Sequence, residues 1–166
     1  MAGKADFTPD EWKTILESTM MAGIAVTAAD PSGLWGTLQE SMASAKAVLG
    51  ASHDAAADEL VKAVSADFET SEGRSTAREG LSAQLGGSKP SEITGKAIQV
   101  LRQAADLVEA KAARDAPGFK AWLCTISQKV AEASTEGGVL GFGGVRVSEA
   151  EKATLEQISA ALGLPT

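Results

Sequence analysis

The chain has 166 residues, 44% of them hydrophobic, which is enough for one domain with a core of its own. Its 22 acidic residues outnumber 15 scattered basic ones, and because phosphate backbones repel a chain of charge −7, we expect no nucleic-acid partner. A single cysteine, Cys124, excludes an internal disulfide, and the first predicted helix lacks an apolar run long enough to span a bilayer. We therefore expect a cytoplasmic protein without membrane insertion.

The first predicted helix begins at Pro9. Thr8 and Glu11 form a capping-box pattern, and proline is favoured at the first helical position. Apolar residues then recur at helical spacing over residues 12–24. Asp30–Gly50 is a second predicted helix, since "DPSG" stops the first one and Gly50 is a plausible end.

Helical periodicity also dominates the rest of the chain, and no alternating pattern indicates a strand. Ser148 and Glu151 form a second capping-box pattern in front of the last helix. The predicted helices are 51–68, a short one around Ala77, Leu81 and Leu85, 92–113, 119–135, and one that starts at Ser148 and carries Leu155, Ile158 and Leu162. The sequence thus predicts an all-α single domain, 1–166, built as a bundle or orthogonal array of six to seven helices.

The segment "EGGVLGFGGVRVSEAEK" (136–152) holds five glycines between Gly137 and Gly144, and we call 137–144 the glycine-rich loop. It has no GxxxxGK[ST] pattern and no preceding strand, so we do not expect it to bind phosphate. We interpret it as an elbow that docks the last helix, in which glycines permit tight turns. The alternative is an exposed recognition loop, because a phenylalanine between glycines is costly to leave in water. The candidate interaction residues are Val139, Leu140, Phe142 and Arg146.

Other chemically active side chains give weaker signals. His53 is the only histidine, so no Cys-His or Ser-His-Asp signature is visible, and Cys124 lies among apolar residues as a packed thiol would. Two charged groups are interpreted as solvated helix faces: Asp54, Asp58 and Glu59, and Arg74, Arg78 and Glu79. We therefore predict no catalytic residue, no cofactor and no metal ligand.

The C-terminal segment "GVRVSEAEKATLEQISAALGL" resembles the tail of the TerB-like domains of bacterial tellurite-resistance and stress systems. A fainter similarity lies in "MAGIAVTAADPSGLWGTLQES". The resemblance implies an all-helical fold and a stress-related role in the bacterial cytosol. Acidic loop residues are thought to hold a metal in that family, but here Gly143 replaces the acid and the first loop offers Asp30 alone. The matching residues are Gly144, Arg146, Val147, Ser148, Glu151, Leu155, Ile158, Leu162 and Gly163.

The absence of a visible catalytic pattern and the acidic, low-aromatic composition favour a non-enzymatic interaction or scaffold module with a protein partner. Two alternatives remain open. One is a small-molecule-binding protein or enzyme with a pocket between helices near the glycine-rich loop. The other is a subunit of a larger assembly, which the alanine-rich helix faces indicate.

Overall fold

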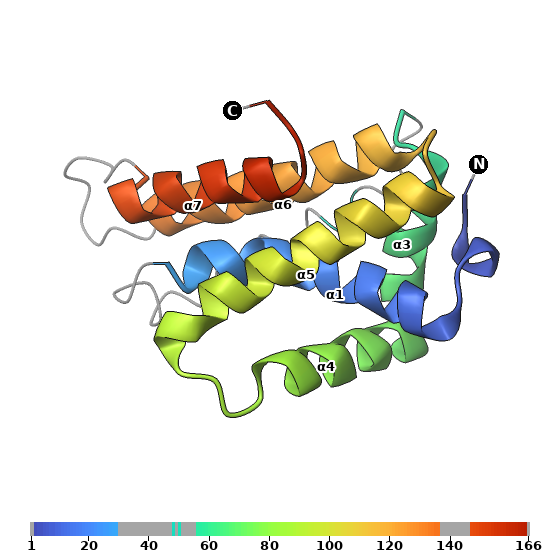
Figure 1. Cartoon of the computed structure of the whole chain (residues 1–166), viewed down its shortest axis with the longest axis horizontal. Helices are drawn as coiled ribbons and strands as arrows, with labels where there is room; N and C mark the ends of the chain where they lie inside the picture. The colour runs from blue at the N-terminus through green and yellow to red at the C-terminus, as the bar shows by residue number, and fades with distance from the viewer. Residues whose placement is uncertain (1, 30–47, 49, 51–55, 137–146, 166) are drawn as a thin grey trace.

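The computed structural model describes residues 2–29, 48, 50, 56–136 and 147–165. Within these residues the fold contains six α-helices, one short 3-10 helix and no strand, so the predicted all-α class is confirmed. The elements, drawn in Figure 1, are η1 (Lys4–Asp6), α1 (Pro9–Thr27), α3 (Glu59–Glu69), α4 (Ser71–Leu85), α5 (Pro90–Lys111), α6 (Ala116–Glu136) and α7 (Glu149–Ala161).

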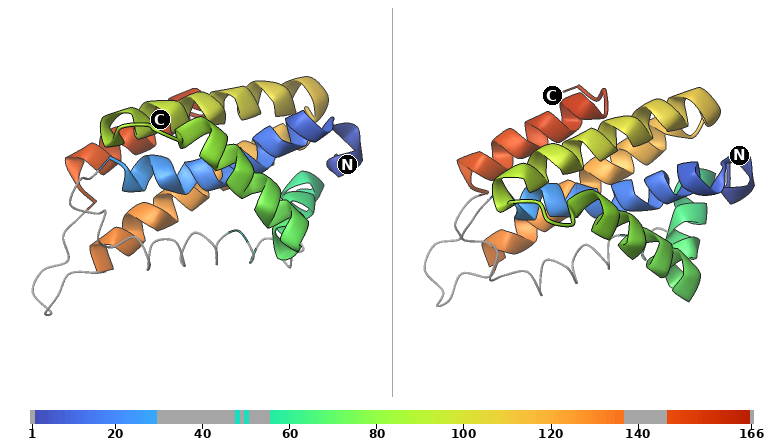
Figure 2. Two further views of the ribbon diagram at one scale, coloured as in Figure 1. Left: turned by 90° about the horizontal axis from the view of Figure 1, so that it is seen from below. Right: turned by 60° about the horizontal axis from the view of Figure 1, so that its bottom comes forward.

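Helix α1 lies at the centre of the described fold and packs against α4, α5, α6 and α7. Figure 1 shows α7 at the top, α4 at the bottom, and α1 and α5 between them, with α3 close to the N-terminus. The two further views in Figure 2 show α4 on the side away from α7. The largest fully buried side chains come from all of these helices except α4, and they are Ile15, Leu16, Met21, Val26, Leu60, Val64, Leu101, Phe119, Leu123, Ile126, Ile158 and Leu162.

The start of α1 follows the predicted capping box. The Glu11 amide donates to Thr8 Oγ1 over 3.3 Å, and the Thr8 amide donates to Glu11 Oε2 over 2.7 Å. This exchange satisfies two of the backbone groups that a helix N-terminus leaves without partners. The predicted start at Pro9 is therefore confirmed.

The third predicted helix begins later than expected. Helix α3 starts at Glu59, because Asp58 has an extended backbone (φ −62°, ψ 153°) and Ala56 and Ala57 are not helical. The prediction of 51–68 was wrong over 56–58, and residues 51–55 lie outside the described residues. The second predicted helix, Asp30–Gly50, also lies outside them, except at positions 48 and 50.

The boundary between α5 and α6 also differs from the prediction. Residues 112–115 form the turn, and Pro117 and Gly118 belong to the first turn of α6. Proline is tolerated there because the first helical N–H groups have no intrahelical acceptor. The predicted start at Phe119 was therefore three residues late.

Candidate functional site

The four candidate interaction residues, Val139, Leu140, Phe142 and Arg146, lie outside the described residues, as do His53 and Asp54. The two helices that flank the glycine-rich loop are described. Helix α6 ends at Glu136, and Val130 and Ala131 in its last turns are buried. Helix α7 begins at Glu149 and packs against both α5 and α6.

The start of α7 is fixed by the second predicted capping box, which is confirmed. The Glu151 amide donates to Ser148 Oγ over 3.2 Å, and the Ser148 amide donates to Glu151 Oε2 over 2.8 Å. Glu151 is itself buried, and Ile158 and Leu162 of the predicted stripe are fully buried, whereas Leu155 is half-buried. Both flanks of the glycine-rich loop are thus held by the core.

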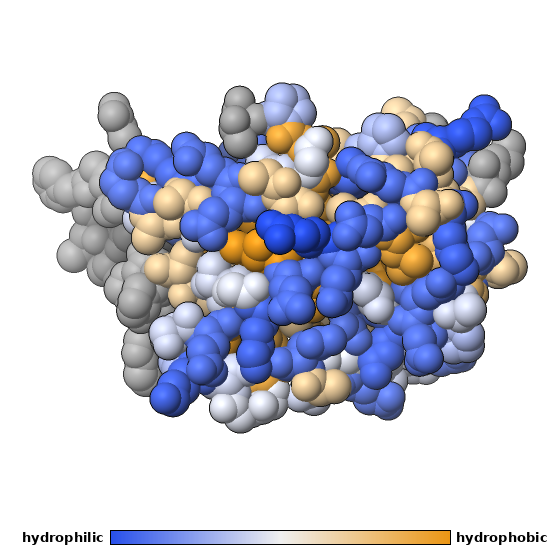
Figure 3. All heavy atoms as spheres, viewed as in Figure 1, coloured by the Kyte–Doolittle hydropathy of each residue, from blue (hydrophilic) through white to orange (hydrophobic). Residues whose placement is uncertain are grey.

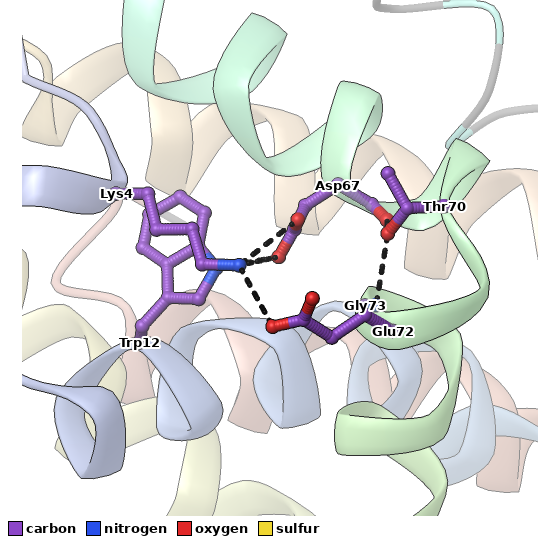
Figure 4. A network of polar contacts seen from close by, with 6 residues as sticks. All are labelled: Lys4, Trp12, Asp67, Thr70, Glu72 and Gly73. Carbon is purple, nitrogen blue, oxygen red and sulfur yellow. Dashed lines mark hydrogen bonds and ion pairs between the residues drawn. The ribbon is translucent and has the colours of Figure 1, made fainter.

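The main polar cluster of the described residues is centred on Asp67, near the end of α3 (Figure 4). The indole N–H of Trp12 donates to Asp67 Oδ2 over 2.7 Å, and Lys4 Nζ lies 3.2 Å from Oδ1 and 3.3 Å from Oδ2. Glu72 is a more distant partner of Lys4, at 3.8 Å. The Asp67 side chain is 12% exposed, so its charge is largely removed from water and is compensated by these donors. One carboxylate therefore joins η1, α1 and α3.

The turn between α3 and α4 extends this cluster. Thr70 Oγ1 donates to the Asp67 carbonyl over 2.7 Å and accepts the Gly73 amide over 2.9 Å, so it caps α4 (Figure 4). A Cβ placed on Gly73 would overlap the Asp67 carbonyl oxygen, and hence the two helices meet at a position that requires glycine. Arg74 Nη1 donates to the carbonyls of Phe68 and Glu69 over 3.0 and 2.7 Å.

A second acid, Glu17 on α1, is 4% exposed. It lies against α4, where Gly80 leaves room for it, since a Cβ on Gly80 would overlap the Glu17 side chain. Burial raises the pKa of Glu17, while Lys13 and a hydrogen bond with the Gln84 side chain act in the opposite direction. Among the described helices, Glu17 is thus a buried carboxyl group that forms no salt bridge.

Other buried polar side chains connect segments that are far apart in the sequence. Ser127 Oγ on α6 lies 2.8 Å from the carbonyl oxygen of Ala22 on α1, and Asp115 Oδ2 accepts the Ala2 amide over 3.1 Å. Lys120 of α6, which is 8% exposed, pairs with Glu109 of α5. Each of these groups is used to hold one element against another.

The remaining predicted residues have ordinary surroundings. Cys124 is half-buried and lies 3.6 Å from Ser159 Oγ, as expected for a packed thiol. Arg74, Arg78 and Glu79 are exposed, which confirms the solvated face. Asp58 was assigned wrongly to such a face: it precedes α3, is half-buried, and fills the place where Gly118 has no side chain. Among the described residues no three His, Cys, Asp or Glu side chains are grouped to hold a metal.

Sequence reasoning missed Asp67 and Glu17. Trp12 gave an indirect signal for the first, because a buried indole N–H requires an acceptor, but nothing in the spacing identified residue 67 as that acceptor. For Glu17, the signal lies in another helix, where glycine at position 80 creates the space. Both contacts depend on how helices cross, which periodicity does not report.

Hydrophilic residues cover most of the face shown in Figure 3, and hydrophobic residues occur on it in separate small areas. In the described part of the chain, every helix is too short or too polar to cross a bilayer. Comparison of the chain with family models, curated proteins and solved structures gave no match.

Proposed function

We propose that this protein is a non-enzymatic helical module that binds a protein partner, with a stress-related role of the TerB-like kind. The observation that supports this proposal is the anchoring near both flanks of the glycine-rich loop: α6 buries Val130 and Ala131, and α7 starts at a complete capping box. A loop carried between fixed helix ends is the usual way in which a rigid scaffold presents binding residues.

The polar contacts inside the fold support the same proposal. Asp67 is bound by Trp12 and Lys4, and Ser127 and Lys120 link α6 to α1 and α5. These side chains stabilise the scaffold, so we assign partner binding to Val139, Leu140, Phe142 and Arg146.

Affinity capture from native cell extract, followed by mass spectrometry, tests the proposal. We expect Arg146→Ala to reduce the amount of a reproducible partner, because Arg146 combines charge with planar hydrogen bonding that suits protein interfaces. Arg102→Ala, which removes an exposed arginine from α5, is the matched control and should capture as much as the wild type. Equal capture by both variants would refute the assignment to this segment.

Phe142→Ala separates recognition from the elbow interpretation. As a recognition residue Phe142 can be removed with little change in unfolding free energy but with reduced capture. As a buried anchor its removal costs about 3–5 kcal/mol in a denaturant melt.

Light scattering on the purified protein and a thermal-shift screen with metabolites address the two alternatives, a larger assembly and a small-molecule site.

A further inference from the structure

Helix α4 buries less apolar surface than its neighbours. Its buried residues are Gly73, Ala77 and Gly80, whereas α5 buries side chains as large as Leu101 and Val108. Hydrophobic stabilisation scales with the apolar area removed from water, and small residues remove little. Elements with few buried apolar contacts open at the lowest free energy, so α4, whose Leu81 and Leu85 are only partly buried, is suited to open.

The connection at the C-terminal end of α4 suits such a movement, whereas its N-terminal end is held against α3 by Thr70 and Arg74. Thr70 in front of it has an extended backbone (φ −82°, ψ 154°), and Gly86 and Gly87 follow it. Gly87 has a φ of 74°, a conformation that glycine adopts without strain. Figure 1 shows α4 at the edge of the molecule, joined to α3 and α5 through these two short turns.

The closed position of α4 covers Glu17. The absence of a side chain at Gly80 allows the α4 backbone to lie directly over the Glu17 carboxyl group, and the Gln84 side chain of α4 hydrogen-bonds to it. Glu17 is 4% exposed in this arrangement. Removal of α4 would return the carboxyl group to water.

The charged groups around this contact are few. Lys13, one turn earlier on α1, is the charged group that acts on Glu17. On α5, Lys96 Nζ donates to Ser88 Oγ over 2.7 Å and lies 3.4 Å from the Gln84 carbonyl oxygen. The charged side chains of α4 itself, Glu72, Arg74, Arg78 and Glu79, are exposed.

We propose that α4 is a proton-linked flap, which lies closed on α1 while Glu17 is protonated and opens when Glu17 ionises. A carboxylate is far better solvated by water than by a helix interface, so ionisation favours the open state. Because burial raises the pKa of Glu17 in the closed state, closure is strongest below the ordinary glutamate pKa. It weakens as the pH rises from that value through the raised pKa.

Hydrogen exchange of the whole chain, measured between about pH 4.5 and 7 and corrected for intrinsic exchange rates, tests the flap. We expect protection of α4 amides, relative to α5 amides, to fall as the pH rises, by up to about tenfold for each unit by which the pKa is raised. Glu17→Gln should keep α4 protected across this range, because the amide cannot ionise. Glu156→Gln, on the exposed surface of α7, is the control and should behave as the wild type.

Gly80→Ala provides an independent variant. Its methyl group displaces the Glu17 side chain toward water, so the pH dependence of α4 protection should disappear. Gly95→Ala, at an open position of α5, should leave that dependence intact. The proposal is overturned if the protection of α4 falls with pH equally in the wild type, in Glu17→Gln and in Gly80→Ala. It is also overturned if Glu17→Gln leaves α4 unprotected at every pH, since the ionised carboxylate would then be what holds the helix.

Discussion

Asp67 is the residue at which three segments of the chain meet. Its carboxylate accepts the buried Trp12 indole N–H and pairs with Lys4, so neither donor is left without an acceptor. We predict that Asp67→Ala lowers the unfolding free energy by about 1–3 kcal/mol, the usual cost of leaving a buried donor unpaired. Chemical denaturation with tryptophan fluorescence measures this directly.

Glu72→Ala is the control for Asp67→Ala, because Glu72 also approaches Lys4. Its side chain is 82% exposed and 3.8 Å from the ammonium group, so we expect a change within about 0.5 kcal/mol. Equal effects of the two substitutions would show that Asp67 contributes only as a surface charge.

Gly73 and Gly95 are both helical glycines, but they should respond oppositely to alanine. At Gly95 a Cβ meets nothing within 4 Å, and alanine should stabilise the protein by about 0.5–1 kcal/mol through helix propensity. At Gly73 the Cβ would overlap the main-chain carbonyl of Asp67, which cannot move without separating α3 from α4. We therefore expect Gly73→Ala to destabilise by about 1–3 kcal/mol in the same melts. A stabilised Gly73→Ala protein would contradict the close packing of these two helices.

At the scale of elements, the capping box of α7, like that of α1, is an interaction that the sequence predicts in full. Ser148→Ala should cost about 1 kcal/mol, because the Glu151 amide loses its acceptor. Ser148→Asp should recover most of this loss, since aspartate caps as well as serine. Thermal melts of the two variants give the comparison, and an equal loss in both would indicate that the hydroxyl is not acting as a cap.

Local patterns in the sequence predict some helix starts correctly and miss others, for a physical reason. Caps and apolar periodicity are local, so Thr8 with Glu11 and Ser148 with Glu151 marked the starts of α1 and α7 correctly. The predicted start of α3 was wrong because Asp58 has an extended backbone before the helix, and its side chain lies against Gly118, which belongs to another element. Junctions such as Asp67 with Trp12 are equally non-local, and composition carries no signal for them.

At the scale of the whole molecule, stability should depend on pH through Glu11. The hydrogen bond from Lys111, over 2.6 Å, is the first cause that lowers the pKa of Glu11. Its contribution to stability is therefore present above the ordinary glutamate pKa and is lost as the pH falls through the lowered value. The opposite holds for Glu17, whose pKa is raised: its contribution to stability is present below the ordinary glutamate pKa and is lost as the pH rises through the raised value.

We predict that Lys111→Met reduces the loss of melting temperature on acidification from about pH 5 to pH 3, because Glu11 then loses the largest cause that lowers its pKa. Lys129→Met removes an exposed lysine from α6 and is the matched control, which should lose stability as the wild type does. If the two variants lose the same amount of melting temperature between about pH 5 and pH 3, the Lys111 contact is not the cause of the acid sensitivity.

We propose that the buried contacts of Asp67, Ser127 and Lys120 serve the structure of the bundle, while the segment around Arg146 binds a partner. The most direct measurement compares partner capture with melting temperature for Arg146→Ala and Asp67→Ala, at a temperature where both are folded. We predict that Arg146→Ala melts as the wild type and captures less partner, and that Asp67→Ala melts lower and captures the same amount. Unchanged capture by Arg146→Ala, or loss of capture by folded Asp67→Ala, would contradict this claim.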